Sequence, residues 1–197
     1  PNYLASFDFP NTLRIWKLFI NWTTPASSHL DGPFNLTTAT AGMIDWTSIP
    51  QKGTTQLLDS LGDRLMFSAQ YRNMGDHESL WLNHTVSSGG VAAVRWYEVR
   101  DLSATPTLYQ QGTYAPGDGN YRWMGSLAVD QDGNMALGYS ASSSALYPSI
   151  RYAGRLNGEP LGQLPQGEAS LIEGTGSQTG SNRWGDYSTL TLDPTDD

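Results

Sequence analysis

A short arginine-containing motif that recurs along the chain constrains the fold more than any other feature of the sequence. At intervals of roughly 60 residues it opens three similar segments, DRLMFSAQY (63–71), YRWMGSLAV (121–129) and NRWGDYSTLTL (182–192). Between them falls a second series, which consists of LRIWKLFI (13–20), VRWYEVR (94–100) and IRYAGRL (150–156). Two interleaved series with a similar period predict tandem copies of one structural unit.

The segments between these motifs alternate apolar and polar residues, a pattern that is typical of half-buried strands. Glycine-rich stretches separate them, and DQDGN at 130–134 contains the Asp-Gly step of a tight hairpin. Two successive units each predict four strands, at 63–72, 78–86, 91–100 and 107–114, and at 122–130, 134–141, 149–156 and 168–173. The flanking sequence predicts two strands of an earlier unit and the first strand of a later one, at 13–22, 34–39 and 183–192.

The composition favours strands and turns over helices, with 21 glycines, 11 prolines, 7 tryptophans, 10 tyrosines and only 15% charged residues. Four-stranded antiparallel sheets repeated at this period are typical of β-propellers. We therefore expect an all-β chain that forms a β-propeller fragment with about three blades' worth of sheet. The expected division is the end of one blade, an insertion, two full blades and the start of a further blade, at 1–40, 41–55, 56–115, 116–175 and 176–197.

A partial ring of blades leaves blade faces uncovered, because each blade buries its faces against its neighbours. This expectation predicts one of two partners for the fragment. The first is the remaining blades of a longer chain, and the second is another copy of the chain through self-association.

Charge and cysteine content exclude several classes of partner and site. The net charge of −8 and the isoelectric point near 4.7 argue against nucleic acid, whose phosphates need a basic surface. No apolar stretch reaches the length of a membrane helix, so we expect no membrane insertion. The absence of cysteine excludes disulfides and thiolate metal sites.

Longer stretches of the chain resemble a propeller region of large secreted bacterial proteins, among them DRLMFSAQYRNMGDHESLWLNHTV, RWMGSLAVDQDGNMALGYSASSS and LPQGEASLIEGTGSQTGSNRWGDYS. This resemblance covers nearly the whole chain and implies a propeller fold and a secreted, extracellular location. The chain is more loosely similar to sialidases, which are propellers that use three arginines, a Tyr-Glu pair and an Asp. It lacks their Ser-x-Asp-x-Gly-x-Thr-Trp turn, which weakens the comparison.

The repeated arginines are candidates for ligand binding. If each motif forms the innermost strand of a blade, Arg64, Arg122 and Arg183 approach one rim of the central axis, where guanidinium groups can hold a carboxylate or sulfate. The alternative is that each arginine ties its sheet to the next by bonding a carboxylate or a carbonyl. Trp123 and Trp184 offer platforms for a sugar ring, although strand alternation favours their packing between sheets.

Asp186 and Tyr187 depart from the repeat and are the candidates for catalysis. They bring a carboxylate and a phenol to a position where the preceding copy of the motif has Met124 and Gly125. A glycoside hydrolase needs a second carboxylate at a fixed distance from the first. The sequence offers four residues for that role, Asp63, Asp76, Glu168 and Glu173.

One turn suggests a cofactor. Asp130, Asp132 and Asn134 place oxygen ligands at alternate positions, as at the start of a calcium loop. The distal glutamate of an EF-hand is missing, and a hairpin turn accounts for the same residues. Ca²⁺ is therefore the one cofactor that the sequence suggests.

These features favour an extracellular binding or interaction module for a glycan or for a partner on a protein surface. The aromatic-rich loops, the acidic charge and the lack of a clear catalytic set support this hypothesis. Two alternatives stay open. One is a glycoside hydrolase of sialidase-like architecture, centred on Asp186 and Tyr187, and the other is a structural repeat that assembles with copies of itself.

Overall fold

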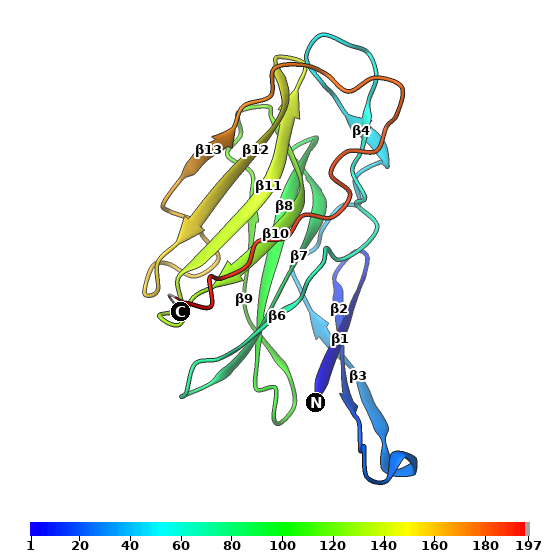
Figure 1. The fold of residues 1–197 in the computed structure, drawn as a ribbon, viewed down its shortest axis with the longest axis vertical. Helices are drawn as coiled ribbons and strands as arrows, with labels where there is room; N and C mark the ends of the chain where they lie inside the picture. The colour runs from blue at the N-terminus through cyan, green and yellow to red at the C-terminus, as the bar shows by residue number, and fades with distance from the viewer. Residues whose placement is uncertain (196–197) are drawn as a thin grey trace.

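The protein is all-β in the computed structural model, which describes residues 1–195 (Figure 1). Four antiparallel sheets are present in that range. Sheet 1 contains β1 (Asn2–Asp8), β2 (Thr12–Phe19) and β3 (His29–Thr37). Sheet 2 contains β6 (Gln70–Asn73), β7 (Glu78–Ser88), β8 (Val91–Arg100) and β9 (Thr107–Tyr114). Sheet 3 contains β10 (Tyr121–Val129), β11 (Met135–Ser143), β12 (Leu146–Arg155) and β13 (Glu168–Ile172).

Two smaller elements complete the described part of the chain. The strands β4 (Thr47–Ile49) and β5 (Leu58–Asp59) form a two-stranded sheet, which lies within and just after the expected insertion. A single 3₁₀ turn, η1 (Pro25–Ser27), lies in the connection between β2 and β3. Within residues 1–195 no helix is long and apolar enough to cross a membrane.

Each of the three main sheets is a meander in which every strand pairs with the next one along the chain. The confirmed part of the prediction is the all-β class with antiparallel sheets. From β7 to β13, the predicted strand boundaries agree with the observed ones to within a few residues. Asp-Gly and Gly-rich turns make these connections short, and short connections favour antiparallel neighbours.

The strand predictions were wrong at three places. Sheet 1 has three strands rather than two, because β1 pairs along the whole length of β2. Of the predicted strand 63–72 only the last three residues form a strand, as the start of β6 (Gln70–Asn73), and an isolated bridge between Leu65 and His84 precedes them. Residues 183–192 contain no strand.

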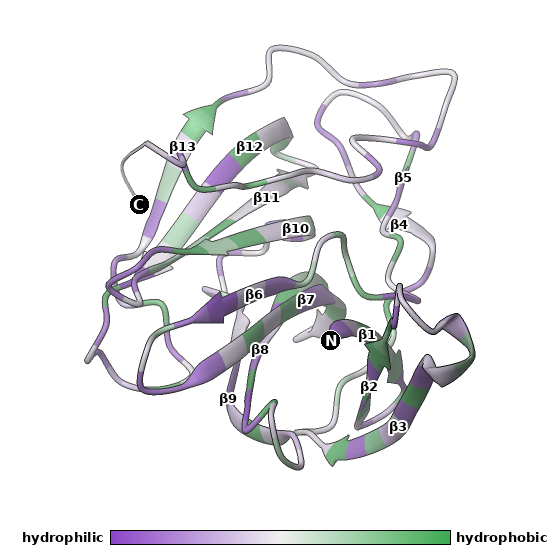
Figure 2. Ribbon diagram, turned by 60° about the horizontal axis from the view of Figure 1, so that its bottom comes forward, coloured by the Kyte–Doolittle hydropathy of each residue, from purple (hydrophilic) through white to green (hydrophobic). Residues whose placement is uncertain are grey.

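Sheet 2 lies between sheets 1 and 3, and its two faces form two hydrophobic cores (Figure 2). Strand alternation in β8 supplies both cores, because successive side chains point to opposite faces of a sheet. Val94 and Trp96 pack toward sheet 3, whereas Tyr97 and Val99 pack toward sheet 1. On the sheet 3 side, Trp96 stacks on Trp81 with ring centroids 6.0 Å apart.

The segment after β13 returns to sheet 3 on the face that is turned away from sheet 2. Ser188 donates a hydrogen bond to the carbonyl of Met124 (2.9 Å), and the Leu190 N–H donates to Ser126 Oγ (2.8 Å). The segment therefore lies against β10. It includes the predicted first strand of a further unit, but bonds between side chains and backbone groups, rather than a backbone ladder, hold it there.

The packing between sheets 2 and 3 is tight at Gly125, which lies in a bulge where the β10–β11 register shifts. A Cβ atom at this position would lie 2.5 Å from Asn83 Oδ1 and 2.7 Å from Val94 Cγ1. Neither neighbour has room to move, because both are fully buried. We therefore expect Gly125→Ala to lower the free energy of unfolding by about 1–3 kcal/mol, measured by urea denaturation.

Gly138→Ala is the matched control for this prediction, because Gly138 also lies in sheet 3 but has space. A Cβ atom there would meet only the carbonyl of Ser126, at 3.9 Å. Its unfolding midpoint should stay close to that of the native chain. Equal losses in the two variants would contradict the steric explanation.

Candidate ligand-binding site

Arg122 is held inside sheet 3 and is only 2% exposed. Its guanidinium pairs with Asp118 in the β9–β10 connection (Nη2 to Oδ2, 2.7 Å) and with Glu168 in β13 (Nε to Oε2, 2.6 Å). Arg122 thus connects the first strand of its sheet to the last one. This placement fits the structural alternative for the repeated arginines, in which the guanidinium bonds a carboxylate, although the carboxylates belong to its own sheet and its entry loop.

Glu168 joins all four strands of sheet 3. Its carboxylate accepts hydrogen bonds from Arg122 of β10, from the Tyr139 hydroxyl of β11 (2.8 Å) and from Arg151 of β12 (2.7 Å). Burial alone raises the pKa of Glu168, but the hydrogen bonds from the two arginines and the tyrosine outweigh burial and hold the pKa below its ordinary value. Glu168 is therefore engaged as an ionised structural carboxylate.

Arg64 and Arg183 are exposed and pair with aspartates close by in the sequence. Arg64 Nε lies 2.8 Å from Asp63 Oδ1, and Arg183 Nη2 lies 2.6 Å from Asp186 Oδ2. The hydrogen bonds that Arg64 donates to Asp63, followed by its interaction with the Tyr187 hydroxyl, raise the pKa of Arg64. The structure thus brings Arg64 and Tyr187 together.

Arg122 lies in a different environment from Arg64 and Arg183. It shares no bonding partner with either of them in the described part of the chain. Tyr187, one of the predicted catalytic residues, lines an open apolar groove together with Leu65 and Phe67. The other, Asp186, has both carboxylate oxygens bonded to Arg183.

The two predicted tryptophan platforms are core residues to different degrees. Trp123 is fully buried and packs with Ile49, Leu58 and Met66, so its ring is not accessible to a ligand. Trp184 packs partly against the same cluster, and its indole N–H donates to Ser140 Oγ (3.2 Å). Trp123 therefore packs in the core, which is the alternative that strand alternation favours, and does not serve as a sugar platform.

The Asp130 turn is closed by its own side chains. Asp130 Oδ1 accepts the backbone N–H groups of Asp132 (3.0 Å) and Asn134 (2.8 Å), and its Oδ2 accepts the Asn134 amide (2.8 Å). Among residues 1–195 no group of three or more acidic or histidine side chains is placed to hold a metal ion. Ca²⁺ at this turn stays a prediction.

A cavity that the sequence did not predict opens between sheets 2 and 3 at one end of their strands. It has a volume of about 370 Å³, within the usual range for small-molecule sites. Residues of β7, β8 and β9 line one side, and residues of β12 and of the loop at 157–161 line the other. The cavity therefore depends on how the two sheets stack.

Glu98 forms part of the cavity wall and is fully buried. Its carboxylate accepts hydrogen bonds from Ser79 Oγ (2.9 Å), Arg100 Nε (2.5 Å) and Gln110 Nε2 (2.5 Å). The Arg100 guanidinium also stacks on Tyr109, 3.4 Å from the ring centroid. The negative charge of Glu98 is thus balanced within the wall.

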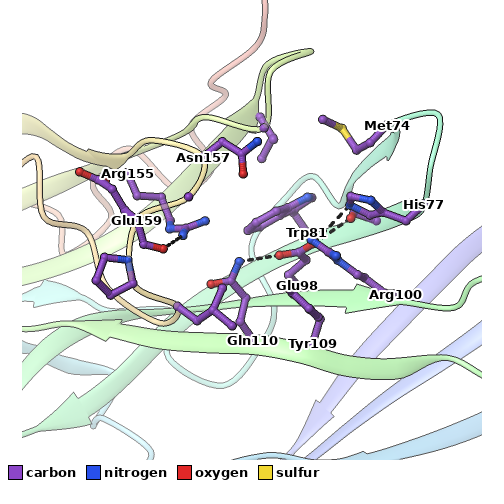
Figure 3. A pocket seen from close by; sticks show the side chains of 16 residues that line it. Met74, His77, Trp81, Glu98, Arg100, Tyr109, Gln110, Arg155, Asn157 and Glu159 are labelled. Carbon is purple, nitrogen blue, oxygen red and sulfur yellow. Dashed lines mark hydrogen bonds and ion pairs between the residues drawn. The ribbon is translucent and has the colours of Figure 1, made fainter.

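Two buried donors of the cavity wall lack a protein partner. Arg155 and Trp81 are each 4% exposed, and Arg155 Nε and Trp81 Nε1 bond to no group in residues 1–195. Arg155 Nη2 donates only to the backbone carbonyl of Glu159 (2.6 Å). Figure 3 shows the guanidinium of Arg155 and the ring of Trp81 approaching the cavity from opposite sides.

The sequence carried one signal for this cavity. In β8 the residues that face sheet 3 run Val94, Trp96 and Glu98, and in β12 Ala153 and Arg155 continue an inward-facing row. A charged residue at the inward end of an otherwise apolar row indicates a buried polar site. The sequence does not predict that these two rows face each other, because their arrangement depends on contacts between sheets.

The sheets and the cavity together define an all-β protein of stacked antiparallel meanders with a polar cavity between two of them. The chain matches no protein-family model, and comparisons with curated proteins and with solved structures find no similar protein.

Proposed function

We propose that the chain forms part of a β-propeller and acts as an extracellular glycan-binding module. Three meanders stack in chain order, as successive propeller blades do. Arg14, Arg95 and Arg151 of the second repeated series lie on β2, β8 and β12, the last strand but one of each sheet. These equivalent positions support the view that the three sheets are copies of one unit. The extracellular location follows from the resemblance to secreted propeller regions.

The cavity between sheets 2 and 3 is the observation that carries the binding function. It combines aromatic residues with buried charged groups, and sugars are recognised by that combination of apolar ring faces and hydroxyl partners. Tyr109 is 43% exposed at the cavity and offers a ring to a ligand. The carboxylate of Glu98 is fully hydrogen-bonded, which favours binding over acid–base catalysis.

A glycoside hydrolase is the second candidate, favoured by the contact between Arg64 and Tyr187. Tyr187 also lies within electrostatic reach of Arg183, which holds Asp186. The exposed groove beside Tyr187 would then receive the substrate.

Tyr109→Ala tests the binding function on a glycan array. We expect it to weaken glycan binding by about tenfold, because an aromatic anchor contributes energy of this order. Tyr152→Ala is the matched control, since Tyr152 is 46% exposed but lies on the other face of sheet 3. Unchanged binding in Tyr109→Ala would place the site elsewhere. Turnover of chromogenic glycosides that Asp186→Asn abolishes would favour the hydrolase.

A further inference from the structure

We infer that the cavity between sheets 2 and 3 recognises the carboxylate of an acidic sugar, held by Arg155 and Trp81. This inference rests on the proposed glycan-binding function and names the class of glycan. It is carried by the two buried donors without partners and by the charges around them.

The side chain of Arg155 is buried without an acidic partner. A guanidinium that is 96% buried is expected to be paired with an acid, because an unpaired buried charge is strongly unfavourable. Arg155 has only the carbonyl of Glu159, whereas the Glu159 carboxylate bonds the Leu156 N–H and Gln166. Among the described residues no carboxylate pairs with Arg155. An anionic ligand in the cavity would supply the missing partner.

The indole N–H of Trp81 is a second buried donor. An indole N–H can only donate, and buried tryptophans usually find an acceptor for it. Trp81 has none in residues 1–195, and its ring is fixed by stacking on Trp96. Trp81 Nε1 and Arg155 Nε therefore provide two fixed N–H donors on the cavity wall. A carboxylate has two acceptor oxygens, one for each of these unpartnered donors.

The charge of the wall selects a monoanion over a polyanion. Arg100 pairs with Glu98 and His77 with Asp76, so Arg155 is the basic side chain of the cavity wall that has no acidic partner among residues 1–195. Glu98 and the overall charge of −8 repel phosphate or sulfate clusters. A single carboxylate is the ligand group that fits.

The shape of the cavity favours a carboxylate on a sugar ring. A volume of about 370 Å³ is larger than a bare carboxylate needs. Tyr109 provides a ring surface beside the charged groups, and Figure 3 shows the Asn157 amide at the same cavity. Asn157 can bond ring hydroxyls, since its side chain has no partner among the residues that the structure describes.

The test titrates the ¹⁵N-labelled protein with galacturonate, glucuronate, galactose, glucose and acetate, and follows the indole N–H signals by NMR. The Trp81 signal is assigned by its loss in Trp81→Phe. We expect it to move with the two acidic sugars at concentrations at least tenfold lower than with the neutral sugars or acetate. Arg155→Met should abolish the shift, whereas Arg14→Met, which removes a partly exposed arginine of sheet 1, should leave it unchanged.

Each other outcome overturns a defined part of the inference. Equal binding of acidic and neutral sugars removes the carboxylate assignment but keeps the glycan-binding function. Equal binding of acetate and acidic sugars would show that the site binds the carboxylate but makes no contact that favours the sugar ring. Binding of none of the sugars overturns the proposed function itself. Thermal unfolding of Arg155→Met checks the fold, and a midpoint well below that of Trp81→Phe would show that Arg155 is structural.

Discussion

Glu168→Gln is expected to lower the free energy of unfolding by about 3 kcal/mol, the lower end of the range for breaking a buried ion pair. The substitution leaves the guanidinium of Arg122 buried with one carboxylate instead of two. It also replaces one of the two acceptor oxygens, which bond Tyr139 (Oε2) and Arg151 (Oε1), with an amide NH₂ group that only donates. The loss stays at the lower end because Asp118 still pairs with Arg122. Urea denaturation followed by tryptophan fluorescence measures the effect.

Glu173→Gln is the matched control for this variant. Glu173 also pairs with Arg151 (3.0 Å), but its side chain is about half exposed. Exposed ion pairs contribute no more than about 1 kcal/mol, so the control should lose little stability. Similar losses in the two variants would show that Glu168 does not have the central role assigned to it.

A second large effect is expected from His84 as the pH falls. Its ring is fully buried beside Phe7, Phe9 and Tyr97, and burial, followed by the charge of Arg95, lowers the pKa of His84 to about 3. In the unfolded chain the histidine titrates near pH 6.5. Between these values the unfolded state binds a proton that the folded state does not. Stability is therefore complete above pH 6.5 and is lost as the pH falls toward 3.

The expected loss is about 1.2 kcal/mol between pH 6 and pH 5, measured as the change in the free energy of unfolding. This window lies above the range in which carboxylates with lowered pKa values, such as Glu168, become protonated. His84→Phe should flatten this slope of stability against pH, whatever its effect on absolute stability. His29→Gln is the control, since His29 is exposed, and it should keep the slope. A native protein without the slope would show that His84 is protonated in the folded state.

The regular part of the fold was predictable because it is encoded locally. Strands β10 and β11 show period-two alternation with the Asp130 turn between them, and the observed hairpin follows that pattern. The alternation of Tyr3, Ala5 and Phe7 in β1 was equally readable, since all three pack toward the core of sheets 1 and 2. The repeat does not predict this strand, because β1 precedes the first copy of the arginine motif.

Other features depend on contacts between sheets and could not be predicted. The alternation in 183–192 predicts a strand that does not form, because each bond from this segment to β10 joins a side chain to a backbone group, as at Ser188 and Leu190, and no backbone ladder is made. The cavity depends on Trp81 and Arg155, which are far apart in the sequence and belong to different sheets. The arginine repeat predicts ligand binding by Arg122, whereas the structure pairs Arg122 with carboxylates of its own sheet and entry loop.

The ion pair between Arg122 in β10 and Glu168 in β13 determines how the strands of sheet 3 separate in local unfolding. An outermost strand such as β13, whose residues are largely exposed, would ordinarily fray by itself at little cost. Its first residue, Glu168, is clamped by side chains from the other three strands. Separating β13 from β12 therefore also breaks the bonds to Arg122 in β10, at the opposite edge of the sheet. We expect sheet 3 to open as one cooperative unit.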